Sequence, residues 1–164
     1  MRRFILIAPA FLAGCHGQPS DHRAAENQHE IAQVKAANSA LPPVQEVIPE
    51  PITDADIQRY DLLGQSCAYA PGTSLGTLVI AREADAFAKI AGEVERFAAD
   101  PGSRALPQRS RSLYNSKNYS LRLGITGSPS QTENRQADYE GTVELRDPHG
   151  RLLYSGTGLA RCGP

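Results

Sequence analysis

The sequence predicts a mainly β fold, a small antiparallel β-barrel or β-sandwich with one short N-terminal helix, over residues 53–164. Two observations predict it. From residue 66 onward, short apolar or alternating runs recur between segments rich in glycine, proline and aspartate. Just ahead of them, Thr53 begins a helix-capping sequence. A signal peptide (residues 1–14) and a polar tether (residues 15–52) are predicted to precede this domain.

The first fifteen residues have the layout of a secretory signal. Arg2 and Arg3 form a basic start, residues 4–13 form an apolar run interrupted only by Pro9, and small residues precede Cys15. The apolar run is too short to cross a bilayer, which requires about 20 apolar residues.

The segment Leu12-Ala13-Gly14-Cys15 resembles the lipobox of bacterial lipoproteins. The resemblance implies cleavage before Cys15 and lipidation of its sulfur by several acyl chains, such as palmitate, that bind the protein to a membrane. Each buried acyl CH₂ contributes about 0.8 kcal/mol. His16, rather than aspartate, follows the cysteine, which by the same resemblance implies the outer membrane, facing the periplasm. A signal that is cut without lipidation is the alternative.

The chain has three cysteines. With Cys15 lipidated, Cys67 and Cys162 remain, one near each end of the domain. An even number in an oxidising compartment predicts a disulfide rather than a metal site. Because a bridge needs Cα atoms within about 7 Å, the pair also predicts that the first and last strands are neighbours.

Composition bears on the classes of partner. A net charge of −1 gives no reason to expect nucleic-acid binding. The chain has no tryptophan, which counts against a surface that stacks on carbohydrate.

Residues 15–52 are expected to be a disordered tether. They are rich in alanine, glutamine and glutamate, and four prolines lie between positions 42 and 51. The alanine-rich part could form helix transiently, and the proline part should be extended. The spacing of His16, His22 and His29 fits no zinc motif, so we interpret them as solvated linker residues.

The folded part begins with a helix expected at 54–62, capped by Thr53 and ended at Gly64. A strand at 66–70 carries Cys67, and an apolar, β-branched strand follows at 77–81 after a turn at Pro71-Gly72.

Residues 85–99 allow two interpretations. Their apolar residues recur at helical spacing, but Gly92 lies in the middle, where it costs a helix about 1 kcal/mol relative to alanine. A hairpin turning at Ala91-Gly92 also fits, with Ala86, Ala88 and Ile90 on one face of a strand.

The second half alternates loops and strands. A basic loop at 100–111 is interpreted as solvated, with an anion or partner site as the alternative; its cations, with one that follows, are Arg104, Arg109, Arg111 and Lys117. A strand at 119–125 precedes a polar loop at 127–137. Strands at 139–146 and 152–160 are joined by a turn at 147–150, with Val143 and Leu145 facing inward and Cys162 just past the last strand.

No motif in the chain indicates catalysis. The glycine-rich run Ser155-Gly156-Thr157-Gly158 lacks the strand-to-helix context of a phosphate loop. His149, the only histidine of the domain, falls in a predicted turn. We therefore expect no catalytic residue, metal or cofactor, and a non-catalytic binding or structural role in the cell envelope.

The order of these features resembles the membrane-bound inhibitors of c-type lysozyme, which are small lipid-anchored β-barrels with a disulfide between the chain ends. The resemblance lies in the lipobox, the two cysteines, residues 88–92 (Ala-Lys-Ile-Ala-Gly), and Ser110 with Tyr114. It favours the hairpin over the helix at 85–99.

In that family a Ser-Gly-x-x-Tyr segment and a later lysine enter the lysozyme cleft. The resemblance therefore implies Ser110 and Tyr114 as partner-binding residues, with lysozyme or another envelope protein as the partner. Arg111 replaces the glycine of the motif, no Trp-Ser-Lys motif follows, and Arg122 is only a loose stand-in for the family's lysine.

Overall fold

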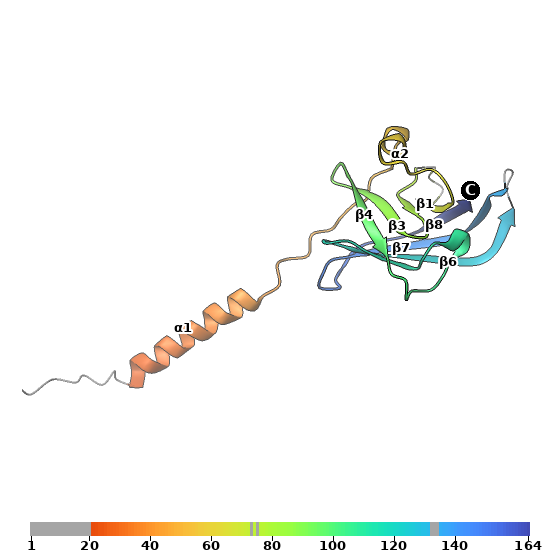
Figure 1. Ribbon diagram of the computed structural model, residues 1–164. Helices are drawn as coiled ribbons and strands as arrows, with labels where there is room; N and C mark the ends of the chain where they lie inside the picture. The colour runs from red at the N-terminus through yellow and green to blue at the C-terminus, as the bar shows by residue number, and fades with distance from the viewer. Residues whose placement is uncertain (1–20, 73, 75, 132–134) are drawn as a thin grey trace, which may run out of the picture. The chain divides into compact units, whose positions relative to one another are not determined.

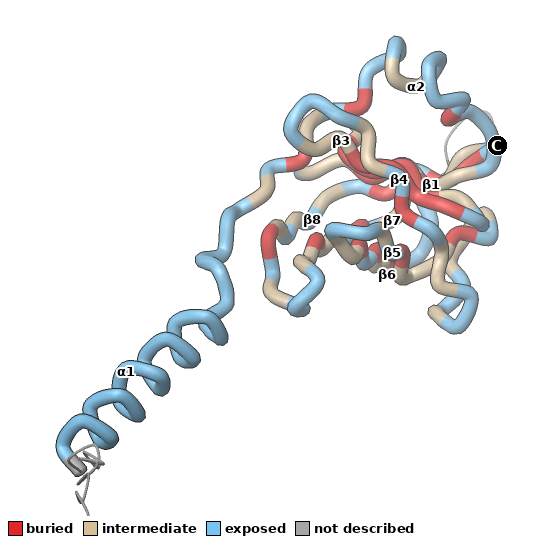
Figure 2. Tube along the Cα trace, turned by 60° about the vertical axis from the view of Figure 1, so that its left-hand side comes forward, coloured by how far each residue is buried: buried red, intermediate tan, exposed pale blue. Residues whose placement is uncertain are grey.

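The computed structural model describes residues 21–72, 74, 76–131 and 135–164. The chain divides into two compact units, Met1–Pro43 and Val44–Pro164. Helix α1 (Asp21–Ser39) belongs to the first unit, and its side chains from residue 22 onward are all exposed (Figure 2). The second unit therefore begins nine residues before the predicted domain start at 53. The signal peptide and Cys15 lie outside the described residues.

The second unit is a closed antiparallel β-barrel, which confirms the mainly β prediction and decides between barrel and sandwich (Figure 1). Each strand pairs with the next, and β8 pairs with β1, so the sheet has no free edge. In the described part of the chain the eight strands are β1 (Ser66–Pro71), β2 (Val79–Ala81), β3 (Asp85–Ile90), β4 (Glu93–Ala99), β5 (Leu113–Asn115), β6 (Ser120–Gln131), β7 (Ala137–Arg146) and β8 (Leu152–Gly163).

The barrel interior is filled by the side chains that alternate inward along each strand. Val143 and Leu145 are 1% and 0% exposed, as predicted, and the inward residues of β6 are Leu121, Leu123 and Ile125. The largest buried side chains are aromatic: Tyr69, Phe97 and Tyr114. The aromatic rings fill the centre without tryptophan.

Strands β3 and β4 form the predicted hairpin, and the helix interpretation of this segment is wrong. The chain turns at Ala91 and Gly92, which both have positive φ, at 50° and 81°. A two-residue turn of this hand matches the twist of antiparallel strands. Ala86 and Ala88 are fully buried on one face of β3.

Helix α2 (Asp54–Tyr60) begins as predicted, with Thr53 and Asp56 forming a capping box. Its end differs from the prediction, because Asp61 rather than Gly64 adopts the left-handed capping conformation, with φ of 51°. Ile57 packs on a second apolar cluster formed by Ile52, Leu62, Ile80 and Phe87. The helix thus covers the outer face of β2 and β3.

Residues 44–52, which we call the strap, are bonded to the barrel although they were predicted to belong to the tether. Val47 N–H donates to Leu153 O (3.3 Å), and Ile52 N–H donates to Thr77 O (2.8 Å). Glu50 forms a bridge with Lys89. These contacts explain why the compact unit begins before residue 53.

Three segments near the barrel ends differ from the predictions. Strand β5 was not predicted, because three residues are too few to show a period. Strand β6 continues to Gln131, through part of the predicted loop at 127–137, with a register irregularity between Thr126 and Ser130. Cys162 lies within β8 rather than past its end.

The predicted disulfide joins Cys67 and Cys162, and both residues are buried. The two cysteines face each other directly in the β1–β8 pairing, with Cα atoms 4.1 Å apart. The first and last strands are therefore neighbours, as the cysteine positions predict.

Replacing Cys67 and Cys162 together by alanine should lower the free energy of unfolding by about 2–5 kcal/mol, because the bridge closes a loop of almost the whole barrel. Urea unfolding of the full chain measures this loss. The Cys15→Ser chain is the matched control, since it removes a cysteine outside the barrel. Equal unfolding midpoints for the double variant and the control would contradict the prediction.

Candidate functional site

A groove of about 720 Å³ lies on the outer face of β6 and β7. Leu121 and Leu123 point into the core, so Arg122 and Gly124 between and beyond them point outward. The β6–β7 register sets Arg122 opposite Glu144 and Gly124 opposite Thr142. The groove is lined by Arg104, Ser112, Arg122, Leu123, Gly124, Thr142, Glu144, Arg146 and Gly150.

Gly124 leaves room for the side chain of Thr142 in the groove wall. A Cβ atom at this position would collide with the hydroxyl of Thr142, so the cross-strand neighbour occupies the space above the glycine backbone. Any larger residue at 124 would displace Thr142. The side chain of Thr142, an exposed residue, therefore lies over the backbone of Gly124 at the groove floor.

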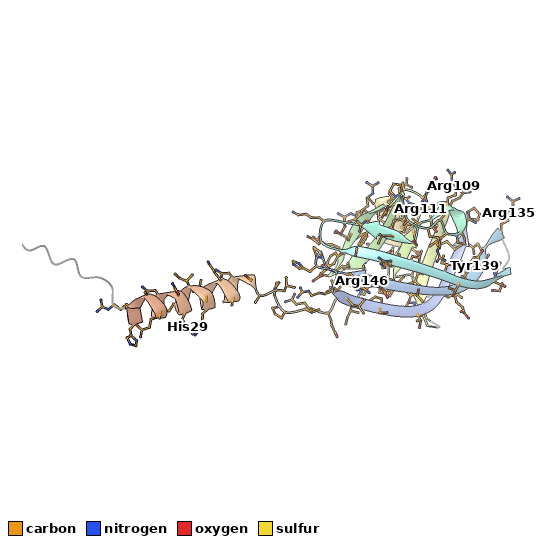
Figure 3. The ribbon with its side chains drawn as sticks, turned by 90° about the horizontal axis from the view of Figure 1, so that it is seen from below. His29, Arg109, Arg111, Arg135, Tyr139 and Arg146 are labelled. Atoms are coloured by element: carbon orange, nitrogen blue, oxygen red, sulfur yellow. A yellow bond between two sulfur atoms is a disulfide. The ribbon has the colours of Figure 1, made fainter. Side chains whose placement is uncertain are left out.

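Arg146 and Glu144 hold each other in place. The Nη2 and Nε atoms of Arg146 donate to one oxygen of Glu144, at 2.8 and 3.1 Å. Nη1 of the same guanidinium donates to Gly150 O at 2.9 Å. Arg146 lies at the end of β7 opposite the β6–β7 hairpin, which carries Arg135 (Figure 3). The charge of Glu144 is thus already neutralised.

Arg104 and Arg122 are the uncompensated charges of the groove. Both side chains are exposed. Within the described chain, neither guanidinium has a hydrogen bond or an ion pair. Arg122 lies opposite Glu144 in the sheet, but Glu144 is bound to Arg146 instead. The lining contains three arginines and one glutamate, so the groove is positively charged.

The other cations predicted around the 100–111 loop have different surroundings. Arg109 pairs with Glu83 at 2.7 Å. The Nη1 of Arg111 lies 3.3 Å from Ser103 O, to which it donates. Lys117 lines a separate pocket of about 270 Å³ near the 147–150 turn. Of the four cations in or near this loop, only Arg104 lines the groove; Arg109, Arg111 and Lys117 do not.

Ser110 and Tyr114, which the resemblance implied as partner-binding residues, are fully buried. Ser110 Oγ donates to Pro107 O at 2.8 Å and lies 3.5 Å from Cys67 Sγ. A partner cannot reach a fully buried side chain in this conformation, so neither residue belongs to the candidate surface. Of the three implied residues, only Arg122 is exposed in the groove.

Tyr114 holds the loop above it through its hydroxyl. The hydroxyl donates to Arg82 O (2.8 Å) and accepts from Arg111 N–H (2.6 Å). Burial raises the pKa of Tyr114 above its ordinary value. Its role in the structure is to fix the loop that carries Arg104.

The glycine-rich run at 155–158 and His149, the other residues considered from the sequence, lie in a strand and in a turn. The run Ser155–Gly158 lies within β8, where a Cβ on Gly158 would collide with backbone atoms of β1 and the following turn. His149 lies in the β7–β8 turn, where its N–H donates to Asp147 Oδ1 (2.9 Å). The close approach of β1 therefore accounts for Gly158, and the turn geometry accounts for the position of His149.

Replacing Tyr114 by phenylalanine should cost about 1–3 kcal/mol of unfolding free energy, because Arg82 O and Arg111 N–H lose their partner. Tyr119→Phe is the control, since Tyr119 lies between β5 and β6 with its ring packed against the core, but its hydroxyl has no hydrogen bond within the described chain. Urea denaturation compares the two. Equal effects would contradict the structural role given to Tyr114.

Comparison with models of protein families, with curated proteins and with solved structures finds no match to this chain. In the described residues, no helix is long and apolar enough to cross a membrane. Also within those residues, no group of three or more histidine, cysteine, aspartate or glutamate side chains is placed to hold a metal ion. The candidate site therefore rests on the geometry of the groove.

Proposed function

We propose that this chain is a lipid-anchored protein of the cell envelope, held in the outer membrane through Cys15 and facing the periplasm, with a non-catalytic binding role. Its binding surface is the groove over β6 and β7. The observation that carries the proposal is the pair of exposed, unpaired guanidinium groups of Arg104 and Arg122.

The chemistry of the groove suits binding of an oxyanion. Guanidinium groups donate several hydrogen bonds in a planar fork that matches carboxylate and phosphate, and they stay protonated at neutral pH. Glu144, the carboxylate of the groove, is already bound by Arg146. The guanidinium groups of Arg104 and Arg122 can therefore attract and orient an anionic partner, while Glu144 keeps Arg146 in place.

The anchor predicts where the chain is found. Cys15→Ser removes the sulfur that would carry the lipid, so the chain should leave the membrane fraction and appear in the soluble periplasmic fraction. Fractionation with immunodetection measures the shift, and mass spectrometry of the native N-terminus tests the lipid directly. An unmodified mature N-terminus in the native protein would refute the anchor.

The groove predicts binding of a simple oxyanion. Titration of the full chain with inorganic phosphate at low ionic strength should shift the amide NMR signals of Gly124 and Thr142. The double variant Arg104→Ala/Arg122→Ala should weaken this response about tenfold or more, because charge-assisted hydrogen bonds are lost.

Arg59→Ala is the control for this titration. It removes one exposed arginine from α2, which covers β2 and β3, and these strands are at least three strands away from β6 and β7 in the closed barrel order. If this control weakened the response as much as the groove variant, or if phosphate moved no groove signal, the binding role of the groove would be refuted.

A second candidate function is inhibition of c-type lysozyme in the periplasm. The specific observation in its favour is that Arg122, the stand-in for the family's lysine, is exposed and lines the groove. Such lysozymes cleave glycans with two carboxyl groups in a cleft, which a guanidinium could pair with. The burial of Ser110 and Tyr114 limits this candidate to Arg122 and its neighbours.

The full chain should then slow lysis of bacterial cell walls by c-type lysozyme, and Arg122→Ala should reduce the inhibition while Arg59→Ala leaves it unchanged. A turbidity assay with increasing molar excess of the chain measures this. Undiminished lysis at high excess would exclude this second candidate.

A further inference from the structure

The lining of the groove indicates the class of its ligand. Besides the unpaired arginines, it presents two residues with hydroxyl groups, the exposed Thr142 and the half-buried Ser112. A ligand that suits this lining therefore carries negative charges, which bind the guanidinium groups. It also carries hydroxyl groups, which form hydrogen bonds with the neutral side chains.

The groove is larger than a single oxyanion requires. Its volume of about 720 Å³ lies within the range of pockets that hold ligands of several rings, roughly 300–1,000 Å³. Arg104 comes from the loop before β5, whereas Arg122 comes from β6, so the charges lie on different elements of the wall. A ligand with anionic groups on successive units can engage both.

The polar lining argues against an acidic protein segment as the occupant. Binding energy at protein interfaces is concentrated in apolar and aromatic anchors that fill pockets. Leu123 is the one apolar side chain in the lining, and it is only 2% exposed because it belongs to the core. The groove thus offers such an anchor almost no apolar surface.

We propose that the groove binds an acidic oligosaccharide, with the carboxylates of uronic-acid units on Arg104 and Arg122 and the sugar hydroxyls on Thr142. This inference rests on the proposed binding role of the groove and adds the class of ligand. The lack of tryptophan, which counts against stacking on neutral sugars, is compatible with a site that binds through charge and hydroxyl contacts.

Three probes of matched length test the proposal on the full chain, purified in a non-ionic detergent at low ionic strength. They are tri-galacturonate, neutral maltotriose, and the end-blocked peptide of three glutamates, which matches the charge of tri-galacturonate. Calorimetric titration should show the tightest binding for tri-galacturonate and at least tenfold weaker binding for both others.

Variants connect the affinity to the groove. Arg104→Ala and Arg122→Ala should each weaken binding of tri-galacturonate about tenfold or more, because each removes a charge-assisted hydrogen bond. Thr142→Val should also weaken binding of tri-galacturonate, but by less than either arginine variant, because it removes one neutral hydrogen bond rather than a charge-assisted one. Arg59→Ala should change neither the binding of tri-galacturonate nor the response to inorganic phosphate.

The outcomes separate this inference from the proposed function. Phosphate responses at the groove without binding of tri-galacturonate would overturn the saccharide assignment and leave the anion-binding role intact. Equal binding of the glutamate peptide would overturn it in favour of an acidic protein segment. Equal losses in Arg59→Ala and the groove variants would show non-specific attraction and overturn it as well.

Discussion

The closure between β1 and β8 is the constraint on which the rest of the structure depends. Six residue pairs align these two strands, from Ser66–Gly163 to Pro71–Gly158, and the buried disulfide joins the second of these pairs, Cys67 and Cys162. Because the sheet closes on itself, inward side chains are enclosed in the core, and outward ones reach the surface unless another segment covers them, as α2 covers Ile80 and Phe87. The outward position of Arg122 follows from this alternation.

The groove also depends on buried groups beneath it. Tyr114 fixes the backbone of Arg111 from below. The neighbouring Ser112 N–H donates to Arg104 O, while Leu123 N–H donates to Ser112 O, so the loop continues the sheet beside β6. The resemblance to lysozyme inhibitors implied that Tyr114 contacts a partner. Tyr114 instead supports, from below, the groove that Arg104 and Arg122 line.

Much of the barrel could be predicted from local patterns, because alternation reveals which face of a strand is buried, as for Val143 and Leu145. The paired cysteines likewise predicted the neighbouring end strands. The groove could not be predicted in the same way. The placement of Arg122 opposite Glu144 depends on the β6–β7 register. The polar residues at 127–131 gave no apolar alternation from which the continuation of β6 could be predicted. The short β5 was also below the length at which a period can be recognised.

If the chain is held at its N-terminus, as we propose, the strap has a mechanical consequence. Any pull transmitted along the tether arrives first at Val47 and then at Glu50 and Ile52, whose hydrogen bonds attach the strap to β8, β3 and the segment before β2. These bonds would be loaded one after another, so the strap can peel away and absorb extension while the barrel stays closed. Force reaches β1 only afterwards, and there a covalent bond at Cys67 carries it.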